Sequence, residues 1–419
     1  MKQLETETGS NRPLGVSIVM PCLNEIHCLP HCIANAREAL AQIEQSYGLA
    51  GEIVIADNGS TDGSQALAET LGARVVAVDR KGYGAAIMGG FDQALGNFLV
   101  MGDCDGSYDF TDAVPMIGRL IDGAEMCMGS RHRGGIAPGA MPWKNRYIGN
   151  PVLTGILNLF FRSGIGDAHC GLRAIRKSAY EALGLSGPGM EFASEMVIKA
   201  SLRRMRIDEV PATLSRDLRD RPPHLRPWRD GWRHLRYLFM LSPTWTFGVP
   251  ALVAMSLALL ILTTVTLNAF GLLGAVATFG ASWTIIGGFL LILGHFSAIM
   301  ALATHFHGVR TGYRTLRPML RRLAPVLTLE HALVVGLCLV ASSAVAFVVI
   351  GSNWSASGFV APASVLPVTL AAVAGALGVQ TILGSFLLSI IVGHDAQFID
   401  TAAKAPPADT ARIPQRRAA

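Results

Sequence analysis

Short apolar runs separated by polar and helix-favouring stretches mark the first half of the chain. Five of these runs are typical of buried strands: 16–20, 52–56, 74–78, 97–101 and 125–128. The stretches between them fit helices: one ending near residue 47, then 64–71, 84–95 and 111–122. Strands that alternate with helices in this way form βαβ units. The pattern therefore predicts an α/β domain with a parallel sheet.

The second half of the chain is apolar over lengths that a soluble fold does not need. No Asp, Glu, Lys or Arg occurs in the 73 residues from Tyr237 to Val309, or in the 64 residues from His331 to His394. About 20 helical residues cross the hydrocarbon core of a bilayer once. We therefore expect two membrane spans in each run, at about 247–267, 281–304, 331–351 and 366–392.

These patterns divide the chain into five parts. We expect a polar tail at residues 1–13 and an α/β domain at 14–216. An amphipathic juxtamembrane segment is expected at 217–243, a four-helix membrane domain at 244–394 and a disordered tail at 395–419. The juxtamembrane part has six Arg and two Asp between Arg219 and Arg236, interleaved with aromatic residues, which suits a helix at the lipid headgroups.

Charge predicts the orientation in the membrane. The loop between the second and third spans has one acid, Glu330, and five arginines: Arg310, Arg314, Arg317, Arg321 and Arg322. Basic loops stay in the cytoplasm. We therefore expect the α/β domain and both termini on the cytoplasmic side, in the plasma or inner membrane if the protein is bacterial. Residues 1–13 have no apolar core of a signal peptide.

Composition narrows the class of protein. Of the 419 residues, 51% are hydrophobic and 16% charged, and the net charge is +5. A secreted, disordered or fibrous protein is excluded. The seven cysteines are an odd number in a chain expected to face the cytosol, so we expect no disulfide framework.

Polar groups follow each of the five predicted strands. They are Asn24 and Glu25, Asp57, Arg80 and Lys81, Asp103 and Asp105, and Arg131. Ligands of such sheets bind at the carboxyl ends of the strands. Two carboxylates spaced as in Asp103-Cys104-Asp105 suit a hard divalent ion that also binds a diphosphate. The strand ends thus predict a site for a nucleotide diphosphate and a metal.

Several motifs together resemble a known family. They are Pro21-x-x-Asn24-Glu25, Asp57-x-Gly-Ser-x-Asp62, Lys81-Gly-x-Gly84, Asp103-x-Asp105 and Asp167-Ala-His-Cys-Gly171-Leu-Arg173. Over residues 14–245 the chain resembles family 2 glycosyltransferases with the GT-A fold. The likeness is closest to polyprenol-phosphate or dolichyl-phosphate mannose and glucose synthases. The fold that we expect is a GT-A domain followed by interfacial helices and four transmembrane helices.

The resemblance implies a role for each matching residue. Nucleotide binding falls to Pro21, Asn24, Glu25, Asp57, Asn58, Lys81, Gly82, Asp103 and Cys104. Metal binding, to Mg²⁺ or Mn²⁺, falls to Asp103, Asp105 and Ser107, where Ser107 stands in place of a Gln that the family often has. The catalytic residues would be Asp105, Arg131 and Arg173. The two arginines would also bind the acceptor phosphate.

The chemistry expected is inverting transfer of a hexose from a nucleotide-diphosphate sugar, UDP-glucose or GDP-mannose, to polyprenyl phosphate (undecaprenyl or dolichyl). A lipid phosphate is already largely ionised near neutral pH, so it needs cations more than a base. Arginine, with its planar fork, is suited to hold it. The glycine- and proline-rich stretch 131–147 is expected to be a loop that closes over the acceptor.

Other functions remain open at this stage. A processive polysaccharide synthase would resemble the same family, but such enzymes generally have Gln-x-x-Arg-Trp, and no Gln occurs between Gln93 and Gln380. Transfer to a lipid hydroxyl would need a base, for which Glu195 or Glu191 is the candidate. A lipid transporter would need ionisable groups in the spans, of which only His295 and His305 come close. The spans could also form a homo-oligomer. We expect no nucleic-acid partner.

Overall fold

The computed structural model describes residues 15–219, 227–273, 280–360, 364–394 and 396–399, with the side chains of 227, 228 and 230 excepted. The chain divides after Ser242 into two units. The predicted N-terminal tail lies outside the described residues, and so does the predicted C-terminal tail apart from 396–399.

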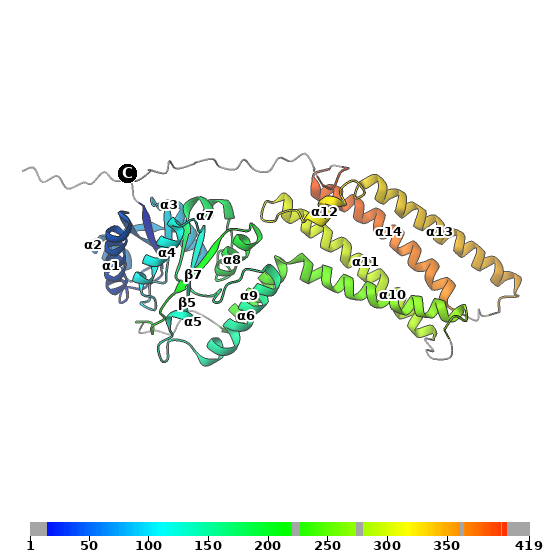
Figure 1. Cartoon of the computed structure of the whole chain (residues 1–419), viewed down its shortest axis with the longest axis horizontal. Helices are drawn as coiled ribbons and strands as arrows, with labels where there is room; N and C mark the ends of the chain where they lie inside the picture. Colours follow the sequence, from blue (N-terminus) through cyan, green and yellow to red (C-terminus); the bar gives the residue numbers. More distant parts are fainter. Residues whose placement is uncertain (1–14, 220–226, 274–279, 361–363, 395, 400–419) are drawn as a thin grey trace, which may run out of the picture. The chain divides into compact units, whose positions relative to one another are not determined.

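Unit 1 is built on a seven-stranded sheet (Figure 1). The strands are β1 (Val16–Cys22), β2 (Gly51–Asp57), β3 (Arg74–Ala77), β4 (Phe98–Met101), β5 (Met126–Ser130), β6 (Arg173–Arg176) and β7 (Ile207–Pro211). They lie in the order β3-β2-β1-β4-β6-β5-β7. The five strands expected from the apolar runs are all present, with ends shifted by no more than two residues.

The prediction of an all-parallel sheet is wrong at β6. This strand pairs antiparallel with β4 on one side and with β5 on the other. It was not expected because it is only four residues long, begins and ends with arginine, and so has no apolar run. The strands β1 to β5 still run in one direction. Their carboxyl ends therefore share one edge of the sheet, and β6 begins at that same edge.

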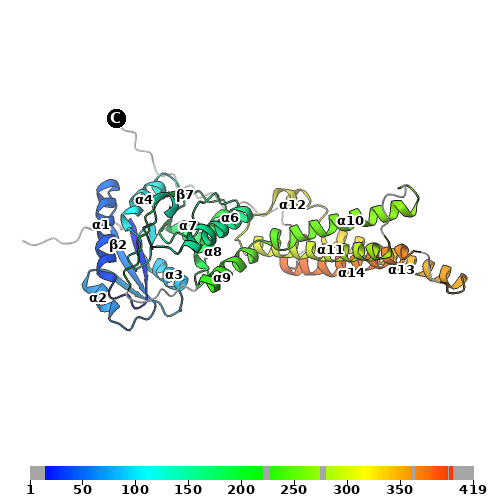
Figure 2. The same ribbon diagram turned by 90° about the horizontal axis from the view of Figure 1, so that it is seen from below.

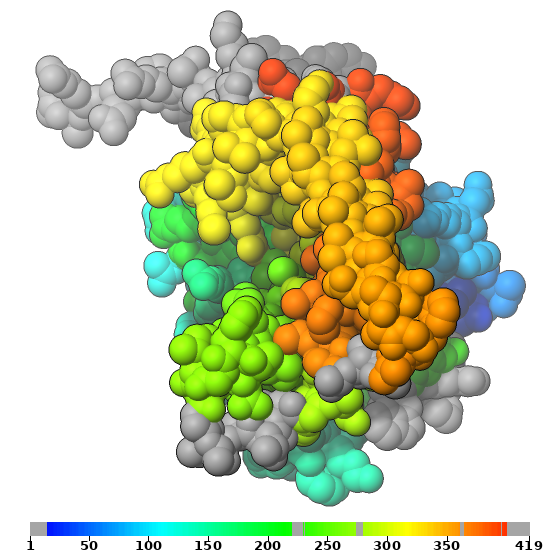
Figure 3. All heavy atoms as spheres, turned by 90° about the vertical axis from the view of Figure 1, so that its right-hand side faces the viewer, coloured from blue at the N-terminus to red at the C-terminus, as the bar shows by residue number. Residues whose placement is uncertain are grey.

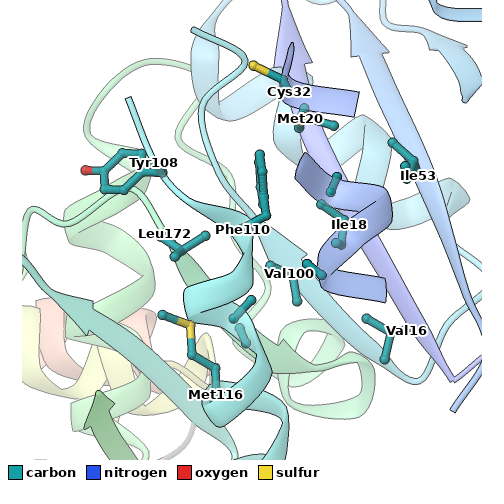
Figure 4. Packing of buried hydrophobic residues seen from close by; sticks show 14 of the residues in the cluster. Val16, Ile18, Met20, Cys32, Ile53, Val100, Tyr108, Phe110, Met116 and Leu172 are labelled. Carbon is teal, nitrogen blue, oxygen red and sulfur yellow. The ribbon is translucent and has the colours of Figure 1, made fainter. Parts of the chain in front are cut away.

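Helices cover both faces of the sheet. One face packs against α1 (Leu29–Tyr47), α2 (Ser64–Thr70) and α4 (Ala113–Ile121). The other packs against α3 (Tyr83–Gln93), α6 (Asn150–Phe161), α7 (Lys177–Leu183), α8 (Phe192–Leu202) and α9 (Pro227–Met240). In Figure 4, side chains of β1 and β4 point toward those of α4 in the first of these cores. Alternate residues of each strand thus supply the two cores.

The segments around the expected acceptor loop are partly helical. Residues Arg131–Gly134 form α5 and Asn145–Gly149 form a π-helical turn, η2, that leads into α6. Irregular backbone is confined to 135–142. The predicted helix at 111–122 is also divided, because Asp109 caps a 3₁₀ turn, η1 (Phe110–Asp112), ahead of α4. The juxtamembrane segment is helical as α9, while residues 220–226 of that segment lie outside the described residues.

Among the described residues of unit 2, four helices are long and apolar enough to cross a bilayer, as the uncharged runs predict. They are α10 (Val249–Ala269), which extends the π-helical turn η3 (Thr244–Gly248), α11 (Ala281–Arg310), α13 (Leu329–Ala356) and α14 (Leu366–Val392). The short helix α12 (Pro318–Arg322) lies in the arginine-rich loop. Contacts join α10 to α11, α11 to α14 and α14 to α13, and Figure 2 shows the four running alongside one another.

Glycine allows α13 and α14 to pack closely against each other. A Cβ atom at Gly378 of α14 would lie 2.7 Å from the carbonyl oxygen of Gly336 in α13, closer than packed atoms approach. Small residues at such positions let membrane helices touch backbone to backbone. The outer side of α13 is by contrast lined with exposed valine and leucine side chains, and the helix forms an open ridge in Figure 3 (yellow to orange).

Of the two ionisable candidates within the spans, His295 has hydrogen-bond partners, whereas Nε2 of His305 is buried and has none among the described residues. His295 of α11 places Nδ1 2.9 Å from Oε1 of Gln380 in α14, and Thr381 lies 3.4 Å from its other ring nitrogen. Hydrogen bonds of this kind hold membrane helices together. The transporter alternative therefore gains no support from His295.

Candidate functional site

The loops that follow β1 and β2 are joined at the carboxyl edge of the sheet. The backbone N–H of Asn24 donates to the Ser60 hydroxyl at 2.9 Å, and that of Glu25 donates to the Ser64 hydroxyl at 3.1 Å. Asn24 has a positive φ of 58° and accepts the N–H of Thr61 at 2.7 Å. The sequence-predicted residues Asn24 and Glu25 are thus joined to the loop that begins at Asp57, and Pro21 precedes them at the end of β1, where Cys22 pairs with Asp57.

Asp57 and Asn58 organise the turn after β2. The Asp57 carboxylate is buried and accepts the N–H groups of Gly59 and Ser60 and the side-chain amide of Gln65. Burial alone would raise the pKa of Asp57, but these donors outweigh it and the pKa is lowered. Asn58 accepts the N–H of Gly82 at 2.8 Å, and the Lys81 ammonium donates to the Asn58 carbonyl at 2.7 Å. The loop after β3 is therefore attached to the loop after β2.

The acidic loop, residues 103–107, follows β4, and β4 pairs with β1 in the sheet. Asp103 is half-buried and its Oδ1 accepts the Tyr83 hydroxyl at 2.9 Å. Burial and the neighbouring charge of Asp105 raise the pKa of Asp103 to about 6. A Cβ atom at Gly171 would lie 2.9 Å from Oδ2 of Asp103, so only glycine leaves that oxygen its space. The negative charge of Asp103 is thus disfavoured by its surroundings, and a cation beside it would stabilise that charge.

Asp105 has a different set of partners. Its Oδ1 accepts both the N–H of Ser107, at 3.0 Å, and the Ser107 hydroxyl, at 2.5 Å. Its Oδ2 lies 3.1 Å from Nη1 of Arg219. The same guanidinium donates from Nε to Oε1 of Glu25 at 2.8 Å. Arg219 thereby links an acid of the expected nucleotide pocket to an acid of the expected metal site.

The donor set suits a divalent metal in part. Among the described residues, no group of three or more His, Cys, Asp and Glu could hold a metal by itself. Two carboxylates and the Ser107 hydroxyl are what the protein offers, and Mg²⁺ sites of this kind take the remaining ligands from substrate phosphates and water. The Arg219 guanidinium against Asp105 shows that the loop accommodates positive charge. The residues therefore fit Mg²⁺ or Mn²⁺ bound together with a diphosphate.

Arg131 lies at the end of β5, as expected, but it is not exposed. Its Nε and Nη2 each donate to one oxygen of the Asp167 carboxylate at 2.7 Å, and its backbone N–H donates to the same group at 3.1 Å. Both side chains are buried. The hydrogen bonds and charge of Arg131 outweigh the effect of burial and lower the pKa of Asp167. An acceptor phosphate would have to share Arg131 with Asp167.

Arg173 is fully buried at the start of β6. Its guanidinium donates to three backbone carbonyls, those of Cys170 at 2.8 Å, Ala193 at 2.6 Å and Ala168 at 3.0 Å. It therefore fixes the Asp167–Arg173 loop against α8 through hydrogen bonds that a phosphate would have to replace. Its prediction as a phosphate ligand finds no support in this arrangement.

Two further predicted residues have buried side chains that are engaged with other protein groups. Glu195 of α8 is fully buried, pairs with Lys199 at 2.7 Å and accepts the N–H groups of Ser186 and Gly187. Cys104 is buried beside the thiols of Cys22 and Cys32. Neither a base at Glu195 nor a side-chain contact from Cys104 to a nucleotide finds support here. All seven cysteines are free.

Sequence reasoning missed two side chains that the fold brings to the site. Tyr83 follows the Lys81-Gly82 loop, and its hydroxyl reaches Asp103 because α3 packs on β1, the neighbour of β4 in the sheet. Arg219 is 114 residues from Asp105 in the chain and 194 from Glu25. It had been assigned to the juxtamembrane segment for its charge. No local sequence pattern predicts a contact between residues so far apart in the chain.

Comparison with known proteins gave matches in both units. Residues 17–184 match "Glycosyl transferase family 2", and residues 302–392 match "Glycosyltransferase family 2 C-terminal transmembrane region". The chain is similar to the low-salt glycan biosynthesis hexosyltransferase Agl6 of Haloferax volcanii, with 34% identity over 89% of this chain and 88% of the relative. It is also similar to the polyprenol monophosphomannose synthase of Mycolicibacterium smegmatis, with 31% identity over 47% of this chain and 76% of the relative. Among solved structures, the chain is similar to glucosyl-3-phosphoglycerate synthase from Mycobacterium tuberculosis in complex with Mn²⁺ and UDP. The match has 20% identity and a TM-score of 0.42, and it covers 55% of this chain and 80% of that one.

Proposed function

The chain belongs to glycosyltransferase family 2, and we propose that it transfers a hexose from a nucleotide-diphosphate sugar to polyprenyl phosphate, with Mg²⁺ or Mn²⁺ at the acidic loop. The expected family and the GT-A fold class are confirmed, and the protein is a hexosyltransferase of the membrane. The donor, the acceptor and the metal dependence are the parts that we propose.

One observation carries the donor assignment. Glu25, Asp57, Asp103 and Asp105 come from the carboxyl ends of three adjacent parallel strands, β2, β1 and β4. A nucleotide binds at that edge in open α/β sheets. Asp57 and Asn58 order the loops that would wall the base, while Asp103 and Asp105 stand where a diphosphate needs a cation. This arrangement supports a nucleotide-diphosphate donor.

Arg131 and the spans support a lipid phosphate as acceptor. Arg131 lies at the end of β5 on the edge where Asp103 lies, and Asp167 accepts from two of the five N–H donors of its guanidinium, so a phosphate could bind the others. The membrane unit gives a lipid substrate direct access to the protein. A relative that matches over its larger part is named as a polyprenol monophosphomannose synthase. Transfer to a lipid phosphate requires no strong base.

The mechanism follows from these residues. An oxygen of the acceptor phosphate attacks the anomeric carbon while the bond from that carbon to the donor diphosphate breaks, and the configuration inverts. Bound Mg²⁺ or Mn²⁺ would supply positive charge to the departing diphosphate. Asp103 and Asp105 would hold it, and the Tyr83 hydroxyl holds the Asp103 carboxylate in place. Asp167 fixes the orientation of Arg131 through two hydrogen bonds.

Transfer to a hydroxyl is the weaker alternative. A hydroxyl acceptor needs a general base within hydrogen-bonding reach. Glu195, the candidate for that task, is enclosed and its charge is balanced by Lys199. The hydrogen bonds and charge of Lys199 and the loop amides outweigh burial and lower its pKa, which makes it a weak base. The geometry at Glu195 thus favours a phosphate acceptor.

We also propose the orientation and domain limits that the sequence suggests. The arginines between α11 and α13 would lie in the cytoplasm, which places unit 1 and both termini there. The GT-A domain would end near residue 216 and the membrane domain would begin near 244. Cysteine labelling from either side of sealed vesicles tests this, at an introduced site in the α11–α13 loop.

Transfer assays with two donors test the proposal as a whole. The full chain in detergent micelles is given labelled UDP-glucose or GDP-mannose, polyprenyl phosphate, and Mg²⁺, Mn²⁺ or a chelator. We expect metal-dependent label in the organic phase from one donor, and none with Asp105→Ala. Label that appears equally with the chelator, or equally with Asp105→Ala, would contradict the metal assignment. No lipid label from either donor would contradict the acceptor assignment.

A further inference from the structure

Arg219 lies between an acid of the proposed nucleotide pocket, Glu25, and an acid of the proposed metal site, Asp105. Its Nε donates to Oε1 of Glu25 at 2.8 Å and its Nη1 lies 3.1 Å from Oδ2 of Asp105. The three side chains are largely enclosed, with 17% of the Arg219 side chain exposed, 6% of Glu25 and 10% of Asp105. An arginine in such a place is a counter-ion for two acids at once.

The backbone holds Arg219 in reach of these acids. Residues 212–219, which we name the strap, follow β7 and return across the acidic loop. The Ser215 N–H of the strap donates to the Ser107 carbonyl at 2.8 Å, and its Leu218 N–H donates to the Asp105 carbonyl at 2.8 Å. The Leu218 side chain lies against Gly106, where a Cβ atom would be 2.6 Å from it. The strap is therefore hydrogen-bonded to the loop that holds the three metal-binding candidates, Asp103, Asp105 and Ser107.

Every carboxylate oxygen of Asp105 is engaged in this state. Ser107 donates twice to Oδ1, and Arg219 lies against Oδ2. A divalent ion bound by Asp105 would bring two more positive charges beside the guanidinium. Like charges repel strongly in an enclosed place, where water screens them poorly. The metal and Arg219 therefore compete for one carboxylate.

We propose that Arg219 is an internal counter-ion that keeps divalent metal off Asp105 until a nucleotide diphosphate is present. The diphosphate offers the released guanidinium new anionic partners, so that metal and nucleotide enter together. The metal alone must break the Glu25 and Asp105 contacts without such a replacement. This inference rests on the proposed function, because it supposes that Asp105 binds the metal of the donor site.

The consequence is a coupling between two ligands that can be measured without turnover. In the wild-type protein, Mn²⁺ alone should bind weakly, and UDP or GDP should tighten it. Removal of the Arg219 charge should tighten Mn²⁺ binding in the absence of nucleotide by about tenfold, since a charged hydrogen bond contributes about this factor. The additional tightening by nucleotide should shrink.

The experiment measures free Mn²⁺ by electron paramagnetic resonance while the full chain in detergent is titrated, with and without UDP or GDP. The variants are Arg219→Gln, Arg219→Lys, Asp105→Asn and, as a matched control, Arg216→Gln. Arg216 lies on the same strap, but it is exposed and donates to the Pro138 carbonyl at 2.7 Å. We expect tighter binding of Mn²⁺ alone in Arg219→Gln, an intermediate value in Arg219→Lys, and no change in Arg216→Gln.

Two results would overturn the inference, and they differ from each other. Unchanged or weaker Mn²⁺ binding in Arg219→Gln, while wild type binds Mn²⁺ with nucleotide through Asp105, removes the counter-ion role and leaves the proposed function intact. Mn²⁺ binding that is the same in Asp105→Asn and wild type removes the metal site itself, and with it both proposals.

Discussion

Substitution of Asp167 by Asn tests the buried pair at the end of β5. Asn keeps the shape of the side chain, but it removes the charge and turns one oxygen into an NH₂ group. That group must then face Nε–H, Nη2–H or the backbone N–H of Arg131, all of which are donors. Arg131 would stay buried without its counter-charge.

The expected cost follows from the burial of both partners. Removal of one partner of a buried ion pair lowers the free energy of unfolding by about 3–5 kcal/mol. In a domain of the size of unit 1, each kcal/mol corresponds to about 2–4 °C in Tm. We therefore expect Asp167→Asn to lower the unfolding temperature of this unit by roughly 6–20 °C.

Thermal unfolding of the detergent-solubilised chain, followed by tryptophan fluorescence, measures the change. The matched control is Asp208→Asn, which removes an ion pair with Arg206 that is half exposed and worth less than about 1 kcal/mol. The pKa of Asp167 is lowered in the fold, so its contribution is present above the pKa of an unfolded Asp, about 3.9, and fades as the pH falls below it. An Asp167→Asn protein that melts with the control at pH 7 would refute this account of the pair.

Three further predictions concern other contacts. Tyr83→Phe removes the hydroxyl that donates to Asp103, so half-saturation of transfer by Mn²⁺ should rise severalfold; an unchanged metal titration would contradict this role. Glu195→Gln breaks the buried pair with Lys199 and should lower Tm by several degrees, while sugar transfer per folded molecule stays within about threefold; a folded but inactive variant would restore Glu195 as a base. Gly378→Leu places a side chain against the backbone of α13 and should make crosslinks between engineered cysteines on α13 and α14 slower, whereas undiminished crosslinking would show that the helices do not touch there.

The elements that the sequence predicts correctly are those with a strong repeating pattern. The five apolar runs form β1 to β5, and the two long uncharged runs form the four spans. Periodicity and length decide such elements almost alone. Polar residues directly after the strands also predicted which loops lie close together, because the carboxyl ends of parallel strands share one edge of the sheet.

Elements fixed by tertiary contacts were not predictable in the same way. The strand β6 has only Ala174 and Ile175 between two arginines, and pairing on both sides makes it a strand. The surroundings of Arg173 were not predictable for a related reason. An arginine in a motif suggests a phosphate ligand, but here backbone carbonyls surround it. Whether a charge faces a ligand or the protein interior depends on packing that a single sequence does not contain.

The most direct test of the central claim compares two acceptors that differ only at the reacting end. The full chain is incubated with its donor, metal and either polyprenyl phosphate or the corresponding polyprenol, and the lipid products are measured by mass spectrometry. We predict that polyprenyl phosphate gains one hexose unit linked through its phosphate and that the polyprenol gains none. Glycosylation of the polyprenol at an equal or higher rate, with the phosphate unchanged, would contradict the account.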